Sequence, residues 1–239
     1  MPQKTSHNLL VLLAIGLSIM GAFMPLPLAL YSPTARETNI WWKPVIGSFL
    51  ALICLFGIFI ISFPERCSKN FHPLKTGELA ISEAENSAFH ATSISFKGHH
   101  PDCGNYSAHV ICIDGRVFCA ACTGLFLGAL IVLAGTILYF FVGWNFFEFG
   151  LWSVLVGQVG VDLGFFQFKF RGYARLVVNT FFVVANFLIL AGVDALAQNA
   201  FIDLYLVALI LFWLFTRILV SQWDHWRICH TCELRCRLK

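Results

Sequence analysis

Six long apolar blocks constrain the fold of this chain more than any other feature of its sequence. A helix needs about 20 mainly apolar residues to cross the hydrocarbon core of a bilayer. Blocks of that length lie at 9–30, 45–63, 117–142, 146–168, 176–197 and 201–222. Only 12% of the residues are charged, compared with about 25% in soluble domains. The sequence therefore predicts an all-α membrane protein, folded as a bundle of six transmembrane helices.

The first apolar block has a second interpretation, as a signal peptide. Lys4 precedes the apolar run, which is typical of secretory signals. No small-residue cleavage site follows, however, and Pro25 and Pro27 are typical of a kinked membrane span. Removal of the block would leave the predicted orientation of the later helices unchanged.

The distribution of Lys and Arg predicts how the bundle is oriented, because cytoplasmic loops are enriched in both. In a six-span arrangement one side carries Lys4, Arg66, Lys69, Lys75, Lys97, Arg116, Lys169, Arg171, Arg175, Arg227, Arg235, Arg237 and Lys239. The other side carries Arg36 and Lys43. We therefore expect a multi-pass protein of the cell membrane with both termini and the Cys-rich segments in the cytoplasm. The basic residues are scattered, so we expect no nucleic-acid partner.

The predicted spans divide the chain into four parts. These are an N-terminal two-helix membrane hairpin (1–63), a cytosolic loop (64–116), a four-helix membrane core (117–222) and a cytosolic Cys-rich tail (223–239). The first half of the loop is typical of a linker, or of one short helix beginning near Ser82. In its second half, Asp114-Gly115 between two apolar stretches predicts a β-hairpin with a type I′ turn. This hairpin would bring Cys112 and Cys119 toward each other.

Pairs of cysteine and histidine separated by two residues are the strongest chemical signal in the sequence. Four such pairs occur: His100 with Cys103, His109 with Cys112, Cys119 with Cys122, and Cys229 with Cys232. Two pairs of this kind bind one tetrahedral zinc ion in structural sites. Disulfides are disfavoured in the reducing cytoplasm. We therefore predict zinc as the cofactor, in a small knuckle-like hairpin module, against the alternative of buried free cysteines and surface histidines.

Cys119 and Cys122 also admit a redox interpretation. They lie at the predicted amino end of the third span, where the helix dipole favours the nucleophilic thiolate. A thiol-disulfide oxidoreductase that acts on a partner thiol or on quinone would use such a pair. Covalent haem is not expected, because Glu233 and not histidine follows Cys232.

Polar side chains inside the apolar blocks predict a second site. Ionisable groups within a membrane span are costly and are therefore a sign of function. On the fourth span, Gln158 and Asp162 are one helical turn apart. On the fifth, Arg175, Asn179 and Asn186 share one face of the helix. The topology gathers four of these side chains near the cytoplasmic end as candidate catalytic residues, namely Asp162, Gln167, Arg175 and Asn179.

The alternative for this polar set is a purely structural one. Hydrogen bonds between helices would clamp the bundle together and contribute about 0.6 to 2 kcal/mol each. The simplest such clamp is an ion pair between Asp162 and Arg175. At the opposite end of the bundle, Asp194 and Asp203 adjoin a loop, and we expect both to be solvated.

Several of these motifs together resemble a known family. FCAACTGLFLG, the upstream segment HHPDC, DLGFFQ and RLVVN are similar to the signature of an uncharacterised prokaryotic integral-membrane family, a domain of unknown function. That signature is roughly C-H, VCARCTG, DG-x-x-Q and N-x-L-R. The similar part is 98–187, and the residues on motif positions are Cys119, Cys122, Thr123, Gly124, Gly128, Asp162 and Gln167. Ala121 replaces the usual arginine, and HHPDC replaces the C-H pair. The resemblance implies a common site and no particular reaction.

Three functions are compatible with these features. The first is a cytosolic zinc site that caps an intramembrane polar pocket, in an enzyme or carrier for a lipid or small metabolite. The second is the thiol-disulfide or quinone redox protein. The third is a zinc-stabilised subunit or assembly factor in which the metal only shapes a docking surface. The expected partners are membrane lipids and, for the third function, another membrane protein.

Overall fold

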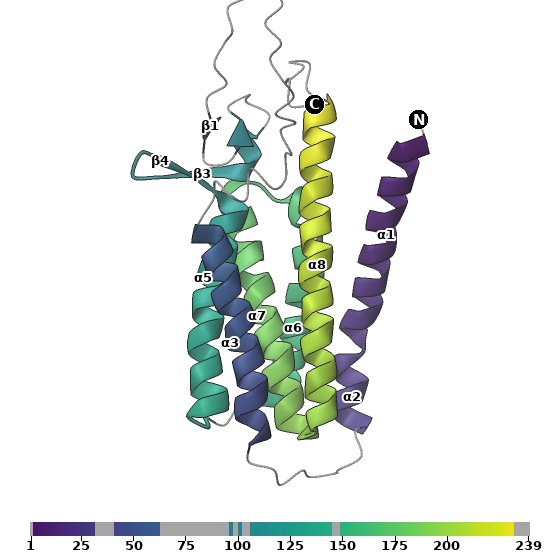
Figure 1. Ribbon diagram of the computed structural model, residues 1–239, viewed down its shortest axis with the longest axis vertical. Coiled ribbons are helices and arrows are strands. Elements are labelled where there is room, and N and C mark those ends of the chain that lie inside the picture. Colours follow the sequence, from purple (N-terminus) through teal and green to yellow (C-terminus); the bar gives the residue numbers. More distant parts are fainter. Residues whose placement is uncertain are drawn as a thin grey trace, which may run out of the picture.

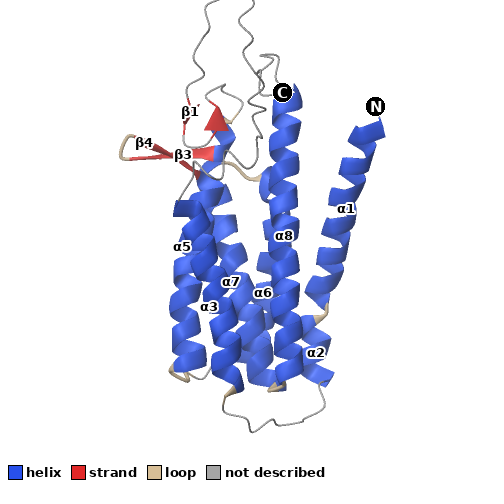
Figure 2. Cartoon of the chain, in the orientation of Figure 1, coloured by secondary structure: helices blue, strands red, loops and turns tan. Residues whose placement is uncertain are grey.

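Long helices make up most of the part of the chain that the computed structural model describes, residues 2–31, 41–62, 96–97, 100–101, 106–144 and 149–231 (Figures 1 and 2). The helices are α1 (Pro2–Phe23), α2 (Pro25–Tyr31), α3 (Trp42–Ser62), α5 (Ala120–Thr136), α6 (Gly150–Phe165), α7 (Gly172–Ala197) and α8 (Ala200–Thr231). A π-helical segment, η2 (Ile137–Phe141), continues α5. The short 3-10 helices are η1 (Ser107–His109) and η4 (Gln167–Lys169).

Among the described residues, five segments are long and apolar enough to cross a membrane. They are Asn8–Tyr31, Trp42–Ser62, Ala120–Phe141, Gly172–Ala197 and Ala200–Ile228. The fourth predicted span is shorter than expected, because α6 has 16 residues and gives way to η4 at its end. The last predicted span is longer, since α8 continues beyond 222 to Thr231.

The chain bends between α1 and α2, where the sequence predicts a kink. Pro25 begins α2 directly after Met24, and a proline inside a helix removes one backbone hydrogen bond and displaces the preceding turn. Helix α1 packs mainly on α8, where Ser18 donates a hydrogen bond to Thr216 (Oγ to Oγ1, 2.8 Å), whereas α2 packs mainly on α7. The second N-terminal helix, α3, packs mainly on α5. In Figure 1 these two helices lie on different sides of α8.

Helix α7 forms the centre of the bundle, and glycines bring its neighbours close. A Cβ at Gly124 of α5 would lie 2.3 Å from the Leu176 carbonyl oxygen, near the start of α7. On α6, Gly164 meets Phe182, whereas Gly150 meets Leu196 near the end of α7. Helix α5 therefore runs parallel to α7, and α6 runs antiparallel to it along most of its length.

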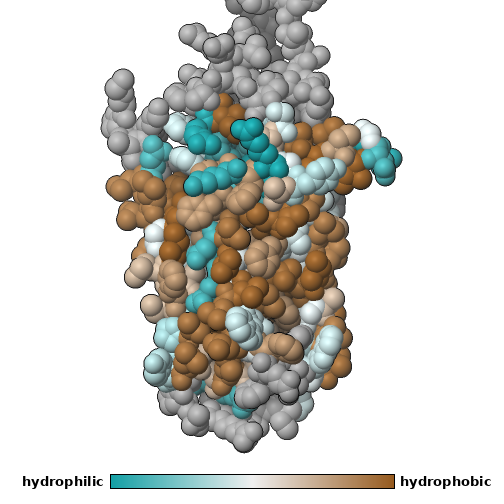
Figure 3. Space-filling view, turned by 180° about the vertical axis from the view of Figure 1, so that it is seen from behind, coloured by the Kyte–Doolittle hydropathy of each residue, from teal (hydrophilic) through white to brown (hydrophobic). Residues whose placement is uncertain are grey.

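The outer surface of the bundle is apolar. Figure 3 shows a mostly hydrophobic face between the two ends of the molecule. Many large apolar side chains are exposed, among them Leu12, Met20, Phe56 and Trp152. A surface of this kind is stable in contact with lipid tails. Together with the five long apolar helices, it identifies a multi-pass membrane protein.

A β-hairpin leads directly into α5, as the sequence predicts. Strand β3 (Val110–Ile113) pairs antiparallel with β4 (Arg116–Cys119). Asp114 and Gly115 between them have φ angles of 49° and 76°, as both central residues of a type I′ turn require. The third helix starts at Ala120, later than the predicted 117, because β4 occupies the first residues of the apolar block. Two further strands, β1 (Phe96–Lys97) and β2 (His100–Pro101), form a separate short pair.

Candidate functional site

Buried polar side chains gather at one end of the bundle, where the hairpin lies and where α5 and α7 begin. Figure 1 shows that α8 also ends on this side of the bundle, beyond the hairpin. The buried side chains of this polar cluster are His109, Gln167, Arg175, Asn179, Arg217 and Asp224. Each is at most 5% exposed. Burial of so many polar groups is costly unless they are paired with one another.

One half of the polar cluster surrounds the Asp224 carboxylate. Arg175 NH2 lies 3.2 Å from Asp224 Oδ2, and Arg227 NH2 lies 3.0 Å from Oδ1. The Nε2 atom of His109 lies 3.1 Å from Arg175 NH1 and 3.6 Å from Asp224 Oδ2. Because a guanidinium only donates, His109 Nε2 accepts from Arg175, which leaves the proton of a neutral imidazole on Nδ1. Arg175 of α7 thus joins Asp224 of α8 to His109 in the turn before β3.

The other half of the polar cluster surrounds Arg217. Its Nε and NH2 atoms donate to Asn179 Oδ1 at 3.1 and 2.5 Å, and NH2 also donates to Gln167 Oε1 at 2.8 Å. Asn179 in turn donates from Nδ2 to the Arg175 carbonyl oxygen at 2.7 Å. These partners of Arg217 are all neutral amides. In this half of the polar cluster, therefore, only the dipoles of two side-chain amides compensate the charge of the buried guanidinium.

The Cys119–Cys122 pair adjoins this second half. Cys119 is the N-cap residue of α5, and Cys122 is the third residue of the helix. Cys119 is buried and Cys122 is half-buried. Both thiols lie within electrostatic range of the Arg217 guanidinium, as does Arg175. The CxxC motif and the polar cluster therefore form one continuous region.

Two donor atoms in the polar cluster lack a partner among the described residues. They are Gln167 Nε2 and Arg175 Nε, on side chains that are 0% and 1% exposed. An unmade hydrogen bond of a buried donor costs about 1–3 kcal/mol. Structures retain such a cost mainly where a ligand, an ion or a water molecule completes the bond.

Three of the four predicted catalytic residues meet in the polar cluster, and one does not. Gln167, Arg175 and Asn179 belong to the network described above. Asp162 lies on α6 and is half-buried, and its Oδ1 atom has no hydrogen-bond partner in the described part of the chain. The acidic partner of Arg175 is Asp224, on a different helix from the one that the sequence suggested.

The predicted zinc ligands are only partly described. The hairpin register places Cys112 opposite Val117 and Cys119 opposite Val110. These two residue pairs lie on the same face of the hairpin, so the two cysteines are diagonal neighbours on that face. Cys112 is nevertheless exposed, whereas Cys119 is buried. His109 turns instead to Arg175. Cys103, Cys232 and the side chains of His100 and Cys229 lie outside the described part, and within that part no group of three metal-binding side chains gathers.

Two residues of the polar cluster were not predicted, although the sequence contains a signal for each. Arg217 is an ionisable residue in the middle of the last apolar block, which by itself marks a candidate site. Asp224 falls just after that block, in the predicted tail. The spacing of Asp203, Arg217 and Asp224 in multiples of seven places all three on one side of a single long helix.

A second buried polar group lies at the opposite end of the bundle. Asp194 and Asp203 are only 3% and 1% exposed, so the expectation that both are solvated was wrong. Tyr139 donates to Asp194 Oδ2 at 2.5 Å, and Lys43 Nζ lies 3.0 Å from the same oxygen. The sequence did not reveal this burial, because both aspartates adjoin a loop. They are buried because the end of α7 and the start of α8 pack against η2 and α3.

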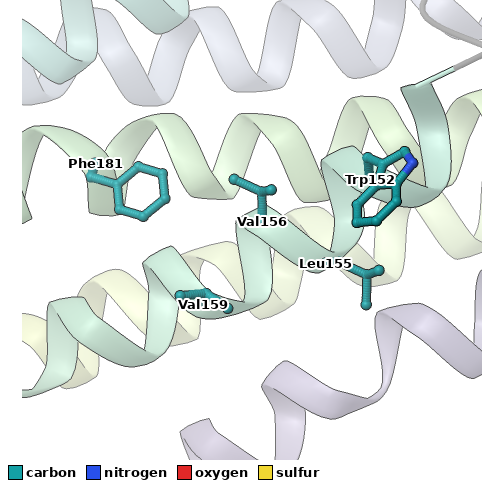
Figure 4. A pocket seen from close by; sticks show the side chains of 5 residues that line it. All are labelled: Trp152, Leu155, Val156, Val159 and Phe181. Carbon is teal, nitrogen blue, oxygen red and sulfur yellow. The ribbon is translucent and has the colours of Figure 1, made fainter.

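An apolar groove opens on the outer surface of α6 (Figure 4). It has a volume of about 220 Å³ and is lined by Trp152, Leu155, Val156, Val159 and Phe181. Trp152 and Val159 are both largely exposed. The groove has the character of the surrounding lipid-facing surface and offers no polar group for chemistry.

No protein-family model, no curated protein and no solved structure matches this chain.

Proposed function

We propose that this chain is a six-span membrane protein in which the Cys119–Cys122 pair belongs to a zinc-thiolate module that caps the polar cluster. In this proposal the polar cluster is the working site of an enzyme or carrier for a lipid or small metabolite. The observation that supports it best is the burial of Arg217, whose guanidinium lies within electrostatic range of the two thiols and donates to neutral amides.

The charge of Arg217 gives the cysteine pair a chemical role. A buried charge is stable only if a group of opposite sign or a dense set of dipoles compensates it. A nearby cation favours the thiolate over the thiol, and the first turn of a helix acts in the same direction. The thiolate is the form that binds zinc. Arg217 and the N-terminus of α5 thus prepare Cys119 and Cys122 as metal ligands.

The remaining zinc ligands come from the two segments that meet beside the pair. Tyr106 contacts both His109 and His225 by its ring, with centroid distances of 5.4 and 5.7 Å. The segment before β3 therefore adjoins the end of α8, which carries Cys229. From these segments and from β3, which carries Cys112, we propose that two of His100, Cys103, Cys112, Cys229 and Cys232 complete a tetrahedral site.

The sixth span in this proposal is α6. Its 16 residues are fewer than a span normally needs. It nevertheless lies antiparallel to α7 from Leu196 to Phe182, and η4 extends it. Six crossings agree with the arrangement in Figure 1, where α1 begins and α8 ends on the hairpin side, the side that also carries Arg116, Lys169 and Arg171. We propose that this side is cytoplasmic.

Metal analysis of variants tests the zinc-thiolate module. The purified wild-type chain is expected to retain about one zinc ion per chain in a site of this kind. Cys119→Ser and Cys122→Ser are expected to lose it. Cys54→Ser is the matched control, because Cys54 is a buried free thiol within α3. Zinc at wild-type levels in the Cys122→Ser protein, or none in the wild type, would contradict the module.

The alternative function is a redox one, and the helix geometry supports it. Cys119 is the N-cap and Cys122 the third residue of one helix, and Cys-x-x-Cys at a helix N-terminus is the spacing of reactive thiol pairs in disulfide oxidoreductases. Two electrons and two protons would pass from Cys119 and Cys122 to a partner disulfide or quinone, which becomes a dithiol or hydroquinone. Metal-free protein that forms a reversible Cys119–Cys122 disulfide, detected by mass spectrometry, would favour this function over the zinc module.

A further inference from the structure

We infer that the polar cluster is a binding site for a phosphate group, held between Arg175, Arg217 and Gln167. This inference rests on the proposed role of the polar cluster as a working site, and it names the class of ligand. Its charge argument applies when a metal neutralises the cysteine pair, and its hydrogen-bond argument applies with or without a metal.

The first observation is the charge of the polar cluster. Arg175 and Arg217 are both buried cations, and they are close enough to repel each other. The buried anion among the described residues of the polar cluster is Asp224, which Arg175 already engages and Arg227 also contacts. If the two thiolates bind zinc, the metal neutralises their negative charge. The polar cluster then carries excess positive charge inside the bundle, which a bound anion would neutralise.

The second observation is the pair of unpartnered donors. Gln167 Nε2 and Arg175 Nε both offer a proton and have no acceptor in the described part of the chain. Both side chains belong to one network, because Arg217 joins Gln167 to Asn179, and Asn179 bonds to the backbone of Arg175. A phosphate accepts several hydrogen bonds at once, and arginine is well suited to such a group. One phosphate would therefore satisfy the charge and the donors together.

The third observation is the depth of the polar cluster. Arg227 stacks over Trp223 at 5.0 Å and over Phe168 at 6.0 Å, and Lys169 lies over Phe166 at 5.3 Å. Tryptophan, lysine and arginine of this kind concentrate at the level of lipid headgroups. Asp224 directly follows Trp223, so the polar cluster lies near that level. The phosphate can come either from the aqueous phase or from a lipid headgroup.

The test measures thermal unfolding of the full chain in neutral detergent micelles that contain no phosphate. One arm adds inorganic phosphate, with sodium chloride at matched ionic strength as the control salt. The other arm adds phosphatidylglycerol, with phosphatidylcholine as the control lipid. At a ligand concentration 100 times the Kd, the unfolding temperature is expected to rise by roughly 5 to 10 °C. A response to inorganic phosphate identifies a soluble ligand, and a response to phosphatidylglycerol alone identifies a headgroup.

Gln167→Glu is the decisive variant. It keeps the oxygen that accepts from Arg217, but it replaces the free donor by a negatively charged oxygen. The fold is expected to persist, because the new carboxylate pairs with Arg217, while the response to phosphate disappears. Gln198→Glu adds the same charge at an exposed position at the other end of the bundle and is expected to respond as the wild type does. Arg175→Lys, which keeps the charge but lacks the Nε donor, is expected to weaken the response.

The outcomes separate this inference from the zinc proposal. No response of the wild type to either ligand overturns the inference, as does an unchanged response in both Gln167→Glu and Arg175→Lys. A phosphate response in protein that contains no zinc contradicts the metal module alone. Zinc that is retained in Gln167→Glu, together with loss of the phosphate response, supports both.

Discussion

Arg175 and Asp224 form an ion pair across the interface of α7 and α8, with 3.2 Å between NH2 and Oδ2 and both side chains 2% exposed. The two residues are far apart in the sequence, and each lies near the end of its helix that faces the hairpin. The pair joins the helix that forms the centre of the bundle to the helix that closes it. Because both side chains are buried, removal of either charge would leave the other buried without its partner.

Asp224→Asn is expected to destabilise the protein strongly. The substitution leaves the Arg175 charge buried without its carboxylate, and breaking a buried pair in this way costs about 3–5 kcal/mol. Thermal unfolding of the purified protein measures the effect. Arg227, which contacts the other carboxylate oxygen but is about half exposed, provides the comparison. Arg227→Gln is expected to change stability far less, and equal effects of the two variants would contradict the structural role of the buried pair.

Asp162→Asn is expected to leave stability unchanged or to raise it. The carboxylate of Asp162 has a buried oxygen without a partner among the described residues, so removal of its charge lowers a desolvation cost and breaks no hydrogen bond of that oxygen. Exchanging Asp162 with Arg175 is expected to destabilise the protein, because Arg175 pairs with Asp224 and not with Asp162. A marked fall in unfolding temperature for Asp162→Asn would show that the carboxylate has a structural partner. Loss of function at unchanged stability would instead assign Asp162 a direct role.

The features that depend only on residues close together in the sequence were predicted correctly. The turn at Asp114-Gly115 forms because both residues tolerate positive φ angles, whatever surrounds them. The bend at Pro25 is equally local. The long apolar helices were found because a bilayer imposes a minimum length on each of them.

The pairing within the polar cluster was not predicted, because it depends on how the helices rotate and where they end. Hydropathy ends the last span at 222, where the residues become polar. The helix continues, since a polar residue such as Asp224 is stable there when a buried arginine faces it. Arg175 therefore meets Asp224, although Asp162 is nearer in the sequence and also lies in an apolar helix. Only the packing of α8 against α7 decides between the two carboxylates.

Gly124→Ala is expected to disrupt the contact of α5 with α7. The added Cβ would lie 2.3 Å from the Leu176 carbonyl oxygen, and a backbone atom cannot move aside without shifting the helix. Overpacking of this kind costs about 1–3 kcal/mol, and a backbone clash lies toward the upper end. Gly57→Ala on α3 is the matched control, because nothing lies within 4 Å of its added Cβ. Equal unfolding temperatures for the two variants would contradict the close approach of α5 and α7.

Tyr139→Phe is expected to destabilise the end of the bundle opposite the hairpin. The substitution removes the hydroxyl that donates to Asp194 Oδ2 and leaves Lys43, half exposed, against the same oxygen. Loss of a hydrogen bond to a buried charged group costs about 1.5–3 kcal/mol. Zinc content is expected to stay at the wild-type level, since Tyr139 lies at the far end of α5 from the cysteine pair. Loss of zinc in Tyr139→Phe would mean that the two ends of the bundle do not fold independently of this contact.

The last prediction concerns the orientation of the bundle and is checked by thiol labelling in sealed vesicles. Cys112 is exposed on the hairpin, and Gln198→Cys places a thiol at an exposed position at the opposite end. If the hairpin side is cytoplasmic, a membrane-impermeant maleimide added to right-side-out vesicles modifies residue 198 but leaves Cys112 and Cys236 unmodified until the membrane is opened. Peptide mapping identifies the labelled positions, and the buried Cys54 is expected to react only after unfolding. Labelling of Cys112 in sealed vesicles would reverse the orientation. The cysteines would then face an oxidising compartment, where disulfides replace zinc-thiolate as the expected chemistry.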